Sequence, residues 1–129
     1  MGKNNLEERL INFAVAVIEI AENLKKSFVG TDLSGQLIRS ATSAAQNYGE
    51  AQSPESRKDF VHKIKVVLIK ELRETKISLS IVHRTKLYSD DSKIQSVIDE
   101  NNELIAIFVT SSVTASKNMG LEDSKKYRR

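Results

Sequence analysis

The sequence predicts an all-α protein that folds as an antiparallel up-down-up-down four-helix bundle. Apolar residues recur every three or four positions along most of the chain, which is the period of an amphipathic helix. Helix-capping residues divide this pattern into four segments with short connections, and no segment shows the alternation typical of a strand. Short connections make successive helices antiparallel neighbours. We therefore expect one bundle domain over residues 1–119, followed by a basic tail over residues 120–129 that we expect to be disordered.

The first helix is predicted over residues 5–28. Gly30 then suits its carboxyl cap, because glycine readily adopts the left-handed conformation that ends many helices. Apolar residues cover more than half of the circumference of this helix, whereas a helix in a single four-helix bundle needs only one apolar face. Its main apolar stripe follows alternating steps of four and three residues, as a helix facing a partner helix requires: Leu6, Leu10, Phe13, Val17, Ile20 and Leu24.

The next two helices are predicted over residues 33–51 and from Ser53 to about Leu87. Thr31 or Asp32 can cap the second helix, because their side-chain oxygens accept hydrogen bonds from its first amides. The third helix starts at Ser53-Pro54, since serine caps and proline lacks an amide hydrogen that would have no partner there. No glycine or proline interrupts the pattern up to Leu87, so we expect one continuous α-helix, the longest in the fold.

The fourth helix is predicted to be capped by Ser89 and to end at Gly120. It carries an almost continuous apolar run over residues 104–109, so it is also apolar beyond one face. The third helix adds outward apolar residues opposite its core stripe. Apolar surface of this extent usually marks an interface, so we expect a homo-oligomer. The outward residues of the third helix are Val66, Ile69, Ile77 and Ile81.

Composition excludes several classes of protein. The chain has no cysteine and two histidines, which rules out disulfides and a thiol nucleophile and leaves little for a metal site, so we expect no metal and no cofactor. The apolar run over residues 13–18, which no other run exceeds, is far shorter than the ~20 residues that span a membrane. The amino end also lacks the apolar core of a signal peptide. We expect a cytoplasmic, non-enzymatic protein that does not enter a membrane.

A polar network is predicted between the second and third helices. At about 100° per residue, Glu71 falls in the middle of the apolar face of the third helix. A buried carboxylate is costly unless it is paired, and Asn47 and Arg39 are the available partners. We interpret these three residues as a structural network. The alternative, a catalytic carboxylate, lacks a second acid or a histidine at a spacing that would share the site.

A motif carries a family resemblance. The Ser/Ala-rich run over residues 39–52 contains Asn47-x-x-Glu50, and Phe60 and Glu71 follow on the next helix. This pattern resembles the four-helix-bundle proteins first noticed as reading frames in intervening sequences of 23S rRNA genes. The resemblance covers nearly the whole chain and implies a ring-like homopentamer without enzymatic activity. The family is distantly similar to the accessory protein of diversity-generating retroelements, which associates with nucleic acid. One departure is Lys76-Ile77, where many relatives carry Tyr-Trp.

Positive charge is concentrated on the third helix. Residues 55–88 hold nine Lys or Arg against four Asp or Glu, although the whole chain carries only +3. Such a face is either simply solvated or binds the backbone of RNA or DNA with little sequence specificity. No exposed aromatic residue is expected among these cations for base stacking. The alternative function is a protein adaptor that uses the outward apolar residues. The candidate nucleic-acid contacts are Lys58, Lys65, Lys70, Arg73, Lys76 and Arg84.

Overall fold

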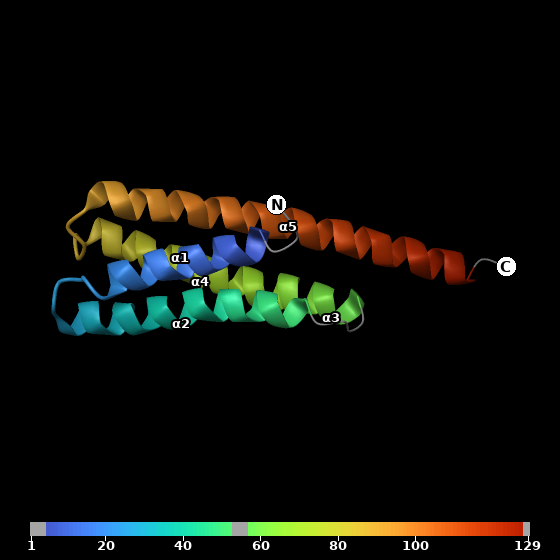
Figure 1. The fold of residues 1–129 in the computed structure, drawn as a ribbon, viewed down its shortest axis with the longest axis horizontal. Coiled ribbons are helices and arrows are strands. Elements are labelled where there is room, and N and C mark those ends of the chain that lie inside the picture. Colours follow the sequence, from blue (N-terminus) through green and yellow to red (C-terminus); the bar gives the residue numbers. More distant parts are fainter. Residues whose placement is uncertain (1–4, 53–56, 128–129) are drawn as a thin grey trace.

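The computed structural model is a bundle of four helical rods (Figure 1). It describes the backbone of residues 5–52 and 57–127, and the side chains in these ranges except residues 57–59, 65, 115–116 and 119–127. The rods are α1 (Asn5–Ala21), α2 (Phe28–Ala51), a third rod, and α5 (Asp91–Tyr127). The third rod joins α3 (Arg57–His62), the π-helix η1 (Lys63–Leu68) and α4 (Ile69–Arg84). The predicted all-α four-helix bundle is confirmed.

Each rod packs against two neighbours. α1 contacts α2 and α5, and α4 contacts the same two helices, so α1 and α4 lie on opposite corners of the bundle. The core between the rods is made of large aliphatic and aromatic side chains with almost no exposure. Tyr48 of α2 and Phe108 of α5 meet edge to face, with ring centroids 5.5 Å apart. The largest fully buried side chains are Phe108, Leu10, Ile20, Leu37, Ile64, Leu68, Leu72, Leu79, Ile94 and Leu104.

The boundary between α1 and α2 lies earlier than predicted. α1 ends at Ala21, and Ser27 caps α2 by accepting a hydrogen bond from the Gly30 amide at 2.9 Å, so Thr31 and Asp32 are not the caps. Gly30 lies inside α2 and has no left-handed conformation. A β-carbon at Gly30 would overlap the Lys25 carbonyl oxygen. This glycine therefore permits the close approach of the connecting loop and does not end α1.

The third rod is not a continuous α-helix. In η1 the backbone is wound more loosely, and the Ile69 amide bonds to the Ile64 carbonyl, five residues earlier. The extra residue per turn shifts the phase of every side chain that follows. Ile69 is therefore buried in the core at 5% exposure, although the regular α-helical wheel places it outward. The same shift moves Glu71 from the middle of the apolar face to its border, where it is half-buried.

Both ends of α5 differ from prediction. Asp90, not Ser89, caps the helix, because its Oδ1 accepts from the Lys93 amide at 3.0 Å. The helix also continues through Gly120 to Tyr127, past the boundary predicted at residue 120. None of the described glycines has a positive φ angle, so Gly120 does not form a helix-ending turn. A glycine inside a helix costs only about 1 kcal/mol, which good helix formers on either side offset.

Candidate functional site

The exposed face of α4 carries four of the predicted basic residues. Lys70, Arg73, Lys76 and Arg84 are all exposed. Among the described side chains, none of the four lies within ion-pair distance of a carboxylate. Their charges are therefore available to an external anion. The other two predicted contacts, Lys58 and Lys65, have side chains outside the described set.

Apolar residues lie between these cations. Ile77 is 60% exposed, Ile81 is 42% exposed, and Val66 in η1 is 50% exposed. Ile77 and Ile81 line a shallow hollow of about 280 Å³, together with Lys76, Ser80 and Arg84. Of the four apolar residues predicted to point outward on the third helix, three are exposed. The prediction is wrong for Ile69, because the phase shift in η1 turns its side chain into the core. We call the exposed cations and isoleucines, Lys70, Arg73, Lys76, Ile77, Ile81 and Arg84, the α4 face.

An open groove of about 840 Å³ runs between α2 and α4 beside this face. Arg39 and Ser43 line it from α2, and Glu71, Glu74 and Ile77 line it from α4. Burial raises the pKa of the Glu71 carboxyl, and the charge of Glu74 raises it further. A hydrogen bond from Ser43 and the charge of Lys70 act in the opposite direction. Glu71 is therefore a partly desolvated acid at the wall of a polar groove.

The predicted network of Arg39, Asn47 and Glu71 is joined only in part. Asn47 donates to the Ser43 carbonyl at 2.8 Å and to its hydroxyl oxygen at 3.1 Å, so it reaches Glu71 only through Ser43. Arg39 makes no ion pair with a described carboxylate, and its guanidinium lies back toward Gly35. Arg39 and Glu71 line the same groove without bonding to each other. The helical pattern alone does not identify Ser43 as the connecting residue.

The fully buried polar contacts lie deeper in the bundle. The Ser40 and Thr75 hydroxyls are 2.7 Å apart across the α2–α4 contact, and Asn101 donates from Nδ2 to the Leu72 carbonyl at 3.1 Å. The Asn101 Oδ1 is the one buried side-chain polar atom without a partner in the described part of the chain. Asn101 is fully buried on the core side of α5. Polar groups at such positions commonly fix the register of a bundle.

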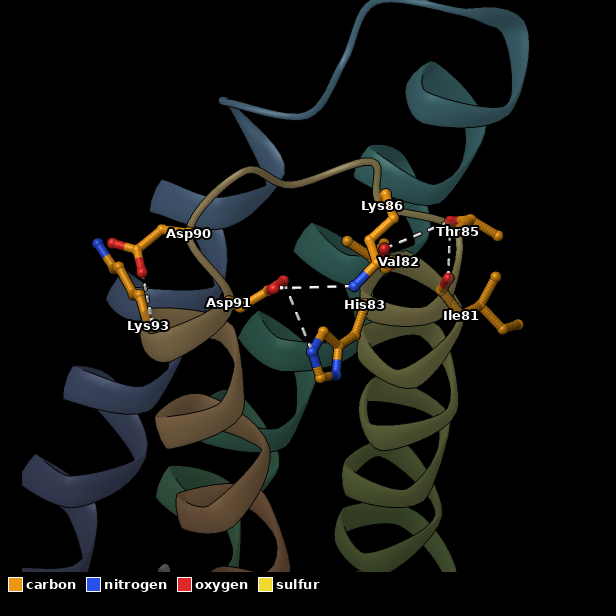
Figure 2. Close-up of polar contacts among 8 residues, drawn as sticks. All are labelled: Ile81, Val82, His83, Thr85, Lys86, Asp90, Asp91 and Lys93. Atoms are coloured by element: carbon orange, nitrogen blue, oxygen red, sulfur yellow. Dashed lines mark hydrogen bonds and ion pairs between the residues drawn. The ribbon is translucent and has the colours of Figure 1, made fainter.

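The α4–α5 connection holds a second cluster of charges (Figure 2). Asp91 lies 3.7 Å from His83 Nε2 and 3.7 Å from Lys86 Nζ. Lys86 has a φ of 60°, and the Leu87 amide bonds back to the Val82 carbonyl at 3.2 Å, as in a helix-ending turn. Two of these three side chains are well exposed, so the cluster orders the turn and contributes little to stability.

Neither a metal site nor a membrane span is found in the described part of the chain. Among the described side chains, no three His, Asp or Glu converge as metal ligands would. None of the described helices is both long enough and apolar enough to cross a membrane.

Comparison with known proteins adds two findings. The model of the 23S rRNA-intervening sequence protein family matches residues 3–110, which is most of the chain. A crystal structure of a protein of unknown function from the S23 ribosomal protein family of Bacteroides thetaiotaomicron is also similar. It shares 27% identity at a TM-score of 0.73, over 83% of this chain and 97% of that one. No curated protein matches the sequence significantly.

Proposed function

We propose that this chain, which belongs to the 23S rRNA-intervening sequence protein family, self-assembles and binds nucleic acid through the α4 face. The observation that carries the proposal is the set of four exposed cations on α4 without a carboxylate partner among the described residues. Cations that are not already paired can replace the counterions of a phosphate backbone. The proposed role is non-enzymatic and cytoplasmic, and the binding is directed at phosphates with little sequence specificity.

Self-assembly is supported by two exposed apolar strips. Ile11 and Val15 of α1 are 42% and 51% exposed, and Ile77 and Ile81 of α4 form the second strip. Because α1 and α4 lie on opposite corners of the bundle, a contact between the two strips joins copies head to tail. Head-to-tail contacts generate a closed ring when the rotation between copies closes. We propose such a ring, of five copies as the family resemblance implies.

Assembly does not require the α4 cations to be covered. Lys and Arg carry their charge at the end of long apolar stems, which can lie along an apolar contact while the charged group reaches water. Along α4, Lys70 and Arg73 precede Ile77, and Arg84 follows it. Repeated around a ring, these cations form several parallel basic stripes, and the phosphate contacts of one nucleic acid then add.

A protein adaptor is the second candidate function. The exposure of Ile77 and Ile81 favours it, because a partner helix can dock its apolar face there. The two functions respond differently to salt. Phosphate binding weakens steeply as ionic strength rises, whereas apolar docking changes little.

Binding to structured RNA and to duplex DNA at low and high salt tests the proposal. We compare the wild-type protein with a Lys70/Arg73/Lys76→Glu variant whose mass by light scattering equals that of the wild type. The expected result is binding that falls with salt and is abolished in the variant. Wild-type protein that binds neither nucleic acid at low salt would reject this function in favour of the adaptor. A wild-type mass equal to one chain would reject the assembly.

A further inference from the structure

Among the described side chains, one exposed aromatic ring belongs neither to the core nor to the α4 face. Phe28, the first residue of α2, is 90% exposed, and the next residue, Val29, is 51% exposed. Exposing a whole phenyl ring to water is unfavourable relative to burying it, because its apolar surface stays in contact with water. The apolar pattern places this residue at the end of the first predicted helix and predicts no exposed aromatic near the cations. The structure instead presents the ring at the tip of the bundle.

Two cations precede the ring. Lys25 and Lys26 are both exposed, and neither forms an ion pair with a described carboxylate. Asp32, one turn after Phe28, is engaged by the Gln36 amide at 2.7 Å, and Glu22 is the acidic residue that lines the same hollow as the lysines. The loop therefore offers an aromatic face beside two available positive charges.

A hollow of about 340 Å³ lies next to this loop, between α1 and α2. Lys25 and Lys26 line it together with Thr31 and Ser34, whose side chains can donate and accept hydrogen bonds. Its volume is at the lower end of the range for small-ligand sites. Thr31 follows Phe28 by three residues, which places the two side chains on neighbouring parts of the α2 surface.

This tip lies at the same end of the bundle as the end of the α4 face (Figure 1). The Lys25 amide donates to the Leu87 carbonyl at 2.8 Å, which ties the α1–α2 loop to the α4–α5 loop. Both loops lie at the same end of the bundle in Figure 1. Arg84, the last cation of the α4 face, is in the final turn of α4 at that end. A strand that runs along α4 toward this end therefore comes near the loop that precedes Phe28.

We propose that Phe28, Lys25 and Lys26 form a binding site for unpaired nucleotides of a single-stranded nucleic acid. A base stacks on the Phe28 ring, and the two lysines contact the flanking phosphates. The occupant is a base because its flat π-face matches a single isolated ring, whereas a membrane surface needs a larger apolar area and more cations. This site rests on the proposed nucleic-acid function and gives it a preference for single strands.

The chain contains no tryptophan, so a Phe28→Trp variant carries a unique fluorescent probe. The matched control is Val113→Trp on α5, because Val113 is also exposed, at 49%. Both variants are titrated with an unstructured oligonucleotide and with a duplex of equal length. We expect the single strand to quench the emission of Phe28→Trp and to leave that of Val113→Trp unchanged. We also expect Phe28→Ala to weaken single-strand binding at least about fivefold and duplex binding less than twofold.

Other outcomes overturn the site and separate it from the proposed function. Single-strand binding that leaves Phe28→Trp emission unchanged rejects the site and leaves binding at the α4 face intact. A blue shift of this emission with protein concentration alone means that a second copy covers the ring. A blue shift with anionic phosphatidylserine vesicles, and no response to oligonucleotide, means a membrane contact. If neither single strand nor duplex binds at low salt, the site and the proposed function both fail.

Discussion

The Ser40 and Thr75 hydroxyl oxygens lie 2.7 Å apart in the buried contact between α2 and α4. Thr75 is fully buried, and Ser40 is 5% exposed at the floor of the groove between the two helices. Thr75 also donates to the Glu71 carbonyl at 2.8 Å, one turn earlier. This pair links the backbone of α4 to α2 directly beneath the groove that Glu71 lines.

Removing either hydroxyl should destabilise the bundle. We expect Ser40→Ala and Thr75→Val each to lower the free energy of unfolding by about 0.5–1.5 kcal/mol, because each removes the buried hydrogen bond between the two hydroxyls, while the remaining hydroxyl keeps a bond to a carbonyl of its own helix. The double variant should cost less than the sum of the two. Denaturant unfolding of all four proteins measures the coupling. Thr42→Val is the control, since the Thr42 hydroxyl bonds only to its own helix, and a cost as large as that of Thr75→Val would contradict the role given to the buried pair.

The Glu71 carboxyl should make stability depend on pH. Folding raises its pKa, mainly by burial, so the folded state favours the protonated form. The stability that Glu71 contributes is fully present below the ordinary pKa of a glutamate carboxyl and is lost as the pH rises through the raised pKa of the folded state. We expect Glu71→Gln to be more stable than the wild type at neutral pH, with a difference that vanishes in acid.

A carboxyl titration followed by NMR checks the cause of this shift. Ser43→Ala removes the hydrogen bond that lowers the Glu71 pKa, so the titration midpoint should rise in that variant. A Glu71→Gln advantage that grows in acid, or a midpoint that falls in Ser43→Ala, would show that the sign is wrong.

Two glycines of α2 should respond to alanine in opposite directions. A β-carbon at Gly30 would overlap the Lys25 carbonyl oxygen, so we expect Gly30→Ala to destabilise the protein by more than about 1 kcal/mol. At Gly35 the nearest atom to an added β-carbon is Nη1 of the Arg39 side chain, at 3.2 Å, which can move away. Gly35→Ala should therefore stabilise the helix by roughly 0.5–1 kcal/mol. Thermal unfolding measures both, and equal shifts of the same sign would contradict this interpretation.

Lys86 is held in the left-handed backbone region with a φ of 60°. This conformation costs a residue with a β-carbon about 1–2 kcal/mol, and glycine adopts it freely. We expect Lys86→Gly to raise the free energy of unfolding by about 0.5–1 kcal/mol, although it removes the ion pair with Asp91. Lys86→Ala is the matched control, because it removes the same ion pair and keeps the β-carbon. If the two variants are equally stable, the backbone conformation has no measurable cost.

The sequence predicts the four helices because their apolar periods are long and regular. It misplaces the α1–α2 boundary because Gly30 fits two roles, a glycine that ends a helix and a glycine that lets a loop pass close to the helix. The position of the Lys25 carbonyl decides between these two roles. It misses η1 because no glycine or proline marks a π-helix. Because η1 is missed, the predicted positions of Ile69 and Glu71 are also wrong, since the direction in which each side chain points depends on the phase of the helix.

The candidate site is predictable to a similar extent. The exposure of Lys70, Arg73, Lys76 and Arg84 follows from their places on the polar side of the helix. The exposure of Phe28 does not, because an aromatic residue at the predicted end of a helix is normally expected in the core. Its position follows from Ser27, which starts α2 five residues earlier than the pattern indicates.

The dependence of binding on salt tests the central claim most directly. The slope of log K against log salt is measured for duplex DNA with the wild type and with single Lys70→Gln, Arg73→Gln, Lys76→Gln and Arg84→Gln variants. Lys117→Gln on α5 is the control, because Lys117 is exposed on a helix outside the α4 face. We predict that each α4 substitution makes the slope shallower by about 1 for every phosphate that one protein copy no longer neutralises. The Lys117→Gln control should leave the slope unchanged. Slopes that are the same for all five variants would contradict binding through the α4 face.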